Sequence, residues 1–248
     1  MKNIVFLFAL LLPCHADAVV SASQTKPMAA TSSYQAKAFM ANYVVFRNGK
    51  DLGTATIKFG EVGNGRWELV TNTIGTGIAA IAGVEVNERS LIRWNEGRPE
   101  TLDYRFNQKA GWKDKQRSIS VNAQNKTIVS QDKENTYTLK YLPGVLDRHA
   151  ITVAIMQDLS QGKRGDLTYP VADRDELNTH LYRLVGNEKM DTQLGLLESV
   201  KVQRIRENAN GKTTTLWLAP NKQFIPLRIE QKEGNGDVIE MRISKIVE

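Results

Sequence analysis

The chain has 248 residues with 33 Lys or Arg against 27 Asp or Glu, which gives a formal net charge of +6. The basic residues are scattered along the chain, which indicates a generally positive surface and argues against a nucleic-acid groove. Such a surface would attract anionic lipids or acidic glycans, although many exported proteins are simply soluble and basic.

The first 18 residues have the three parts of a secretory signal peptide. Lys2 gives a positive start, "IVFLFALLLP" is an apolar run too short to span a bilayer, and residues 16–18 form a small-x-small cleavage site. Cleavage after Ala18 would place the protein in the periplasm and remove Cys14, the only cysteine, so that the mature chain could form no disulfide. A lipoprotein signal ending at Cys14 is the alternative, and Pro13 disfavours it.

Beyond the signal, the pattern predicts a flexible leader and then one β-rich domain. Residues 19–37 are small, polar and without periodicity. Residues 38–248 are a series of segments with alternating apolar and polar residues, none of them long and apolar enough to cross a membrane. In the first segment four apolar residues from Phe39 to Val45 share one face, and Asn48-Gly49 favours a tight hairpin because both residues tolerate positive φ. Turns such as "GEVGNG" and "KEGNGD" join the later segments, which predicts an antiparallel meander.

One segment has helical periodicity. Four apolar residues between Leu146 and Ala154 recur at helical spacing, with Asp147 as N-cap and Gly162 as terminator, so we expect a helix over about Arg148 to Gln161. The predicted fold class is mainly β: a single curled antiparallel sheet, a half-open barrel, with one main helix packed on it or plugging it. A closed lipocalin-like barrel and a β-sandwich are the alternatives.

Three long phrases resemble a known family. They are "YVVFRNGKDLGTATI", "GTGIAAIAGVEVNERSLIRWNEGRPETLDYRF" and "LWLAPNKQFIPLRIEQ". In this order they resemble the bacterial domain-of-unknown-function 3108 family, over nearly the whole mature chain from about Phe39. The resemblance implies an exported β-rich protein of Gram-negative type and brings no catalytic motif. The last phrase is also similar to hairpins of periplasmic lipoprotein carriers, whose half-open barrel encloses a greasy cavity, and this is an analogy at the level of fold.

Signatures of catalysis are weak. The sequence has no G-x-S-x-G nucleophile elbow and no H-E-x-x-H zinc motif. His149 falls in the first turn of the predicted helix and His180 in a polar connection, and we expect both to be solvated. Glu85 and Glu88 are three residues apart on a strand, so they point to opposite faces and cannot easily flank one glycosidic bond. The acids of "ADRDEL" are interrupted by Arg174, which favours a self-neutralised loop over a calcium site.

The segment "IGTGIAAIAGVEV", residues 74–86, carries one charged residue, Glu85, among thirteen. Helix formers bracketed by glycines predict a short apolar helix or a wide loop between two strands. One placement folds it inward as a lid on the core. The other makes it a mobile flap at the mouth of an apolar cavity, or lets it touch a membrane. Burial of each large aliphatic side chain is worth about 1.5 to 3 kcal/mol, so some apolar surface should meet it.

These observations favour a periplasmic, non-catalytic binding or carrier protein for a lipid-like or apolar ligand, without cofactor or metal. An envelope structural or assembly factor that grips another protein is the alternative from a second class, and an uncharacterised hydrolase is a third. An anionic membrane surface is a further candidate partner. The predicted ligand-binding residues are the apolar residues of the glycine-bracketed segment and the aromatic residues expected at inward or rim positions: Ile78, Ile81, Val84, Tyr43, Trp67, Trp94, Tyr104 and Trp217.

Overall fold

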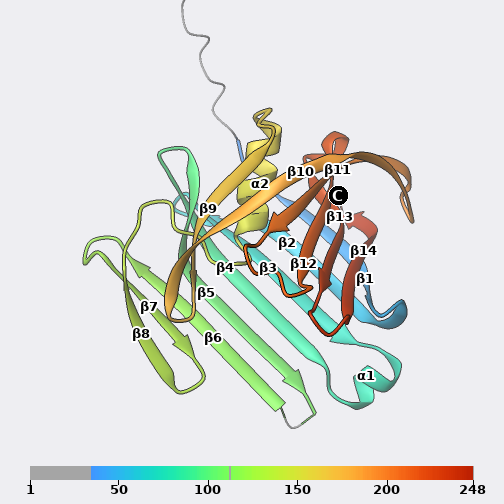
Figure 1. Cartoon of the computed structure of the whole chain (residues 1–248), viewed down its shortest axis with the longest axis horizontal. Helices are drawn as coiled ribbons and strands as arrows, with labels where there is room; N and C mark the ends of the chain where they lie inside the picture. Colours follow the sequence, from blue (N-terminus) through green and yellow to red (C-terminus); the bar gives the residue numbers. More distant parts are fainter. Residues whose placement is uncertain (1–34, 112, 248) are drawn as a thin grey trace, which may run out of the picture. The chain divides into compact units, whose positions relative to one another are not determined.

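The computed structural model describes residues 35–111 and 113–247, so the predicted signal peptide and all but the last residues of the predicted leader lie outside the described residues. The described chain folds into one sheet of 14 strands with two α-helices and a short 3-10 helix (Figure 1). Neither α-helix has the length and hydropathy of a membrane span. The elements are β1 (Phe39–Arg47), β2 (Lys50–Gly63), β3 (Arg66–Gly75), α1 (Gly77–Ile81), β4 (Glu85–Asn95), β5 (Arg98–Ala110), β6 (Lys113–Asn122), β7 (Thr127–Asp132), β8 (Asn135–Lys140), α2 (Ile151–Ser160), β9 (Asp166–Asp173), β10 (Glu176–Thr192), β11 (Gly195–Ile205), β12 (Thr213–Ala219), η1 (Pro220–Lys222), β13 (Ile225–Lys232) and β14 (Val238–Val247).

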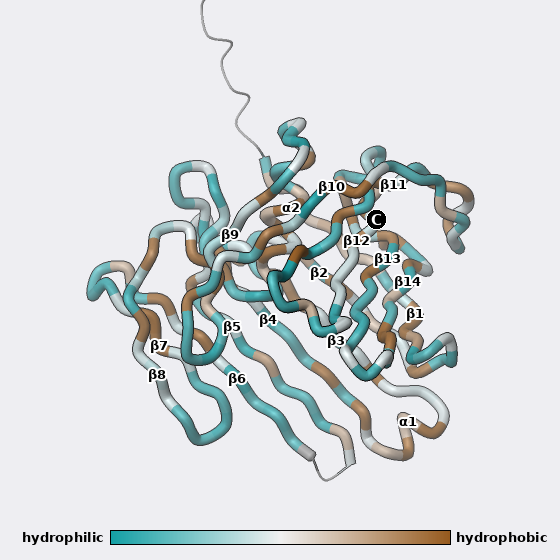
Figure 2. Tube along the Cα trace, viewed as in Figure 1, coloured by the Kyte–Doolittle hydropathy of each residue, from teal (hydrophilic) through white to brown (hydrophobic). Residues whose placement is uncertain are grey.

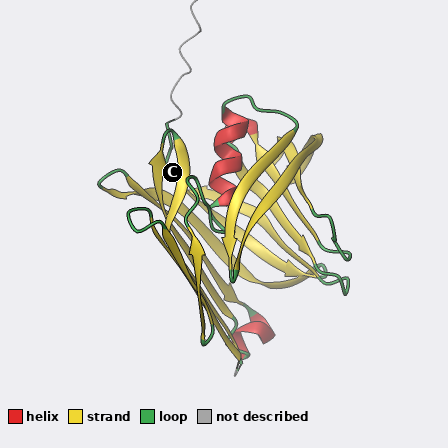
Figure 3. Cartoon of the chain, turned by 60° about the vertical axis from the view of Figure 1, so that its left-hand side comes forward, coloured by secondary structure: helices red, strands yellow, loops and turns green. Residues whose placement is uncertain are grey.

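The sheet consists of two meanders that meet at β1 and β14. Its order is β8-β7-β6-β5-β4-β3-β2-β1-β14-β13-β12-β11-β10-β9, and every paired neighbour is antiparallel. Tyr43 of β1 lies opposite Ile243 of β14, so the first and last strands join the two halves. The sheet curls but does not close (Figure 3). The predicted fold class is therefore confirmed, and the closed barrel and the sandwich are not adopted.

The helix α2 fills the concave side of the curled sheet (Figures 1 and 3). Eight of its ten residues are buried, so it is enclosed on nearly all sides and packs against strands of both meanders. It begins at Ile151 after a turn over residues 148–150, close to the predicted start. The carboxylate of Asp147 accepts hydrogen bonds from the backbone N–H groups of His149 and Ala150, at 2.8 and 2.9 Å, and so holds the turn that leads into α2. The N-cap residue of α2 is Ala150, three residues after the predicted cap, because the chain makes this turn before the helix begins.

The strand faces follow the sequence pattern. Phe39, Ala41, Tyr43 and Val45 are all buried on the inner face of β1, and the hairpin after β1 turns at Asn48 and Gly49 with positive φ at both. The period-two pattern therefore placed the inner face of β1 correctly.

The loop before α2 joins the edge strand β9 to the inner strand β5. Leu146 donates its N–H to the carbonyl of Pro170 and accepts from the N–H of Ala172, both at 2.9 Å, while the carbonyl of Val145 accepts from the N–H of Thr101 at 2.9 Å. The loop, through Val145 and Leu146, thus connects β5 to the edge strand β9. We call these contacts the seam.

The glycine-bracketed segment does not fold inward. It forms α1 at the end of the β3–β4 connection, away from α2 (Figures 1 and 3), and no residue of α1 is buried. Ile78 and Ile81 are 86% and 89% exposed, and this tip is among the most apolar parts of the trace in Figure 2. The placement as a lid on the core is wrong. The reason is local anchoring: the N–H of Thr76 bonds to the carbonyl of Leu52 at 3.0 Å, and the carbonyl of Ala82 accepts from the N–H of Gly111 at 2.7 Å.

Candidate functional site

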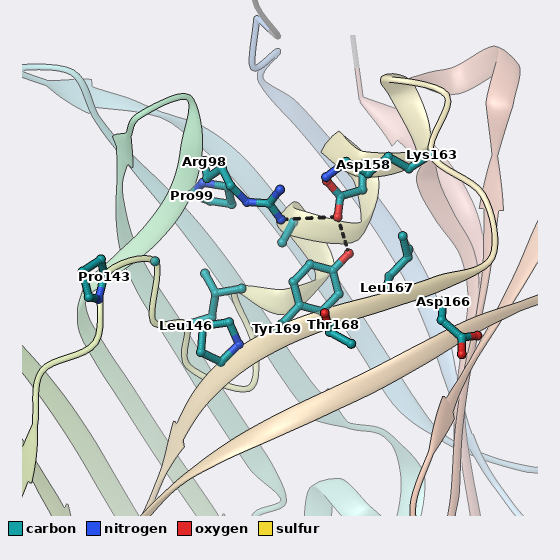
Figure 4. A pocket seen from close by; sticks show the side chains of 13 residues that line it. Arg98, Pro99, Pro143, Leu146, Asp158, Lys163, Asp166, Leu167, Thr168 and Tyr169 are labelled. Atoms are coloured by element: carbon teal, nitrogen blue, oxygen red, sulfur yellow. Dashed lines mark hydrogen bonds and ion pairs between the residues drawn. The ribbon is translucent and has the colours of Figure 1, made fainter. Parts of the chain in front are cut away.

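A pocket of about 380 Å³ lies beside the seam, between α2, the edge strand β9 and the start of β5 (Figure 4). This volume falls within the range of small-molecule sites, about 300 to 1,000 Å³. Its wall comes from four separate stretches of the chain, which the curl of the sheet brings together. The residues that line it are Arg98, Pro99, Pro143, Gly144, Leu146, Ala154, Asp158, Lys163, Asp166, Leu167, Thr168, Tyr169 and Pro170.

Asp158 is the polar centre of this pocket. It projects from α2 and is only 3% exposed. Its carboxylate accepts from the Tyr169 hydroxyl at 2.9 Å and from the Lys163 ammonium at 2.7 Å, and the Arg98 guanidinium lies 3.5 Å away. Figure 4 shows the hydroxyl and the guanidinium converging on this carboxylate. Burial, reinforced by the charge of Asp158, raises the pKa of Tyr169, so the phenol stays protonated and remains a donor.

The pocket rim is held by a second buried carboxylate. Glu100 is fully buried at the start of β5 and accepts from the N–H of Gly144 at 2.7 Å and from the Tyr141 hydroxyl at 3.0 Å. Arg93 and Asn95 donate to it from β4. Burial alone would raise the pKa of Glu100, but these hydrogen bonds outweigh it and lower the pKa. The ionised carboxylate therefore fixes the loop that forms one side of the pocket.

The composition of the pocket wall suits an amphipathic ligand. Prolines and aliphatic side chains supply apolar surface, and no described lining residue forms a nucleophile–base pair with another. Arg98 and Lys163 are both about half exposed, so their charged ends reach solvent while Asp158 holds them at the pocket. An apolar body could rest on the prolines with a polar end at these cations.

The structure places the eight predicted ligand-binding residues outside this pocket. Ile78, Ile81 and the half-buried Val84 belong to the α1 region. Tyr43 and Tyr104 are buried on the inner face, and their hydroxyls donate to the Pro226 carbonyl and the Glu88 carboxylate. The three tryptophans are spread over the sheet: Trp67 stacks on Phe59, Trp94 packs against the core, and Trp217 lies on the outer face under the guanidinium of Arg228.

The pocket residues were not predicted from the sequence because they come from β5, β9, α2 and two connections, which no local pattern joins. Asp158 offered the one available signal, because an acid in the middle of a mostly apolar helix needs a partner when that helix is buried. The other lining residues could not be recognised as one site because they are far apart in the sequence.

The two histidines are less solvated than expected. His180 lies in β10 and is 4% exposed, so its predicted place in a polar connection is wrong. His149 is half-buried, with Nε2 2.8 Å from the Thr71 hydroxyl and Nδ1 3.0 Å from the Ser90 hydroxyl. Ser90 is fully buried and donates to Asp147 at 2.9 Å, so its hydroxyl is engaged in positioning the helix cap.

The acidic residues considered from the sequence are also separated. Glu88 faces inward and pairs with Arg148 at 3.0 Å, whereas Glu85 is exposed and accepts from the side chain of Asn87, so the two acids do lie on opposite faces. Asp173 and Glu176 flank the tight β9–β10 turn. Across residues 35–111 and 113–247, no group of three His, Cys, Asp or Glu side chains has the geometry of a metal site.

One solved structure shares the fold of this chain at a TM-score above 0.5, and two others match less closely. A beta-barrel-like protein of domain of unknown function DUF1849 from Brucella abortus is similar at 11% identity and a TM-score of 0.51, over 84% of this chain and 96% of that chain. The MucA/MucB complex of Pseudomonas aeruginosa matches at 14% identity and a TM-score of 0.36, over 85% of this chain and 51% of that chain. The hypothetical lipoprotein YmcC from Escherichia coli matches at 8% identity and a TM-score of 0.34, over 84% of each.

Comparison with protein families gives a direct assignment, and no protein with a curated description matches the sequence. The model of the family described as protein of unknown function DUF3108 matches residues 34–244. That span includes every described strand except the last residues of β14. The chain therefore belongs to the DUF3108 family.

Proposed function

We propose that this protein is a non-catalytic binding or carrier protein of the periplasm that holds a lipid-like or otherwise apolar ligand in the pocket beside the seam. The observation that carries the proposal is the pocket of about 380 Å³ at the open edge of the curled sheet, with partly apolar walls and two cations at its mouth. The DUF1849 protein from Brucella abortus supports the fold alone.

The position of the pocket favours reversible binding. The rest of the concave side is filled by α2 and the core, so the ligand would occupy the margin and not a hollow centre. The seam beside the pocket has few backbone hydrogen bonds compared with a strand pair. A small opening of the seam would lengthen the pocket enough to admit more of an acyl chain.

The test is recovery of ligand with the protein. Lipids extracted from the protein purified from a bacterial envelope should be identifiable by mass spectrometry, at a ratio near one per chain. Thr168→Trp puts a large ring at an exposed pocket-lining position and should empty the pocket. Thr138→Trp, at an exposed position of the other edge strand, β8, outside the pocket, is the matched control and should retain ligand.

Two results would contradict this function. One is a wild-type protein that arrives without lipid and fails to bind an apolar fluorescent reporter such as N-phenyl-1-naphthylamine. The other is equal occupancy in the two tryptophan variants, because it would show that the bound lipid sits elsewhere on the molecule.

A role in envelope assembly is the second candidate, and the exposed isoleucines of α1 favour it. Because α1 is anchored to β2 and to the β5–β6 turn, Ile78 and Ile81 are presented on a fixed support. An assembly factor should capture a stoichiometric protein from envelope extract, and the double variant Ile78→Ser, Ile81→Ser should lose it. These side chains contribute little to folding, so the variant's unfolding free energy should stay within about 0.5 kcal/mol of wild type.

A further inference from the structure

Two arginines on the inner face of the second meander have no acidic partner among the described residues. Arg204 of β11 lies opposite Tyr182 of β10, whose side chain is buried on the inner face. The Nε of Arg204 is buried and has no hydrogen-bond partner within the described part of the chain. Arg206 follows two residues later on the same side, and its guanidinium donates to the Thr214 hydroxyl at 2.9 Å.

His180 is the third member of this group. It lies two residues before Tyr182 on the same face of β10, is 4% exposed, and its Nδ1 has no hydrogen-bond partner among the described residues. Burial, together with the positive charges of Arg204 and Arg206, lowers the pKa of His180 to about 3. The imidazole is therefore neutral at physiological pH and can offer one N–H donor.

The acidic side chains nearest to the arginines are already engaged. Asp173 lies 3.9 Å from Arg117, and Glu233 pairs with Lys212 at 3.3 Å. Between residues 35 and 247, position 112 excepted, no carboxylate lies within ion-pair distance of Arg204 or Arg206. Burial accordingly lowers the pKa of both guanidiniums. Both guanidiniums are partly buried, and a partly desolvated cation that lacks a counter-charge is costly, so proteins generally pair such groups.

We propose that Arg204, Arg206 and His180 form a binding site for an oxyanion group, a phosphate or phosphate monoester, on the inner face of the sheet. Two guanidiniums can supply paired N–H donors to phosphate oxygens, and the imidazole N–H adds a neutral donor. The anion would supply the missing counter-charge and satisfy the buried donors together. None of the three residues lines the pocket around Asp158, although His180 lies opposite the pocket residue Tyr169 in the β9–β10 register. The site does not depend on the proposed carrier function.

Titration calorimetry at low ionic strength tests the site with two ligands, inorganic phosphate and the short-chain lipid dihexanoyl phosphatidic acid. We expect the wild-type protein to bind phosphate, and the double variant Arg204→Gln, Arg206→Gln to bind it at least tenfold more weakly. Arg105→Gln, on an exposed outer position of β5, removes the same charge per residue and should leave affinity unchanged. In parallel, phosphate should shift the ring resonances of His180 and leave those of His149 in place.

The two ligands separate the sources of the anion. Equal affinity for both would identify the phosphate group itself as the ligand, while tighter binding of the phosphatidic acid would identify a lipid headgroup. The proposal is overturned if neither ligand binds the wild-type protein, or if Arg105→Gln weakens binding as much as the Arg204 and Arg206 changes. A protein that binds phosphate but carries no lipid would defeat the carrier function and leave this site standing.

Discussion

Arg204 combines a partly buried charge with an unsatisfied Nε, and this arrangement should cost stability in the free protein. An unsatisfied buried donor costs about 1 to 3 kcal/mol, and partial exposure of the side chain favours the lower end. Arg204→Met keeps the length of the side chain and removes the charge. We expect the unfolding free energy to rise by about 1 kcal/mol in urea denaturation without phosphate.

The matched substitution for this measurement is Arg105→Met, at an exposed outer position where the effect should stay within about 0.5 kcal/mol. Destabilisation by Arg204→Met would mean that the guanidinium has a stabilising partner in the free protein. A gain in stability accompanied by loss of phosphate binding would be typical of a binding site retained at the expense of stability.

His180 should make stability depend on pH in a defined window. Its pKa is about 3 in the folded protein and about 6.5 in the unfolded chain, so the unfolded state binds more protons between these values. The contribution of His180 to the unfolding free energy is therefore fully present above pH 6.5 and is lost as the pH falls below it. From pH 7.0 to 5.5 the unfolding free energy should drop by about 1 kcal/mol from this residue. In the His180→Gln variant, the decrease in unfolding free energy between pH 7.0 and 5.5 should be smaller by that amount. An identical decrease in the wild type and the variant would show that His180 does not have a lowered pKa in the folded protein.

At the scale of elements, the start of α2 depends on Asp147. This fully buried carboxylate accepts from two backbone N–H groups of the turn that leads into α2 and from the hydroxyls of Ser90 and Thr101. Asp147→Ala removes the cap and leaves both hydroxyls without their acceptor. Loss of a cap costs about 0.5 to 2 kcal/mol and unsatisfied buried donors add to it, so we expect a loss of about 3 kcal/mol.

Chemical denaturation of Asp147→Ala and Asp147→Asn tests this role. The asparagine variant keeps one acceptor oxygen for the helix cap and should recover part of the loss. If both variants unfold at the wild-type denaturant concentration, the hydrogen bonds around Asp147 do not hold the helix in place.

The elements show which parts of the fold were predictable. Period-two alternation gave the buried face of β1, and the Asn48-Gly49 pair gave its hairpin, because both signals are local. The outward position of α1 was not predictable, since it depends on hydrogen bonds to Leu52 and Gly111 from other strands. Arg204 likewise resembles an ordinary surface charge until the register with Tyr182 places it on the inner face.

At the scale of the whole molecule, a 14-stranded sheet curls around one helix without closing, and this arrangement creates the pocket. The site could not be predicted from sequence for the same reason. Its residues meet only after the two meanders have joined at β1 and β14 and the edge strand β9 has approached the start of β5. Local sequence patterns indicate which face of a strand is buried, but they do not indicate which strands far apart in the sequence come into contact.

The seam should be the weakest part of this assembly. The loop holds β9 through the two hydrogen bonds of Leu146, whereas the pair β9–β10 has a continuous register over eight residue pairs. Local openings draw on regions with few backbone hydrogen bonds, so the amides of Leu146 and Ala172 should exchange with deuterium faster than those of β1, which has a partner strand on both sides. A ligand in the adjacent pocket contacts both sides of the seam and should slow exchange there while leaving β1 unchanged. Hydrogen exchange followed by mass spectrometry, with and without bound lipid, measures both effects. Uniform protection across the seam and β1 would show that the pocket does not open by this route, and a ligand would then have to enter through the existing mouth between Arg98 and Lys163.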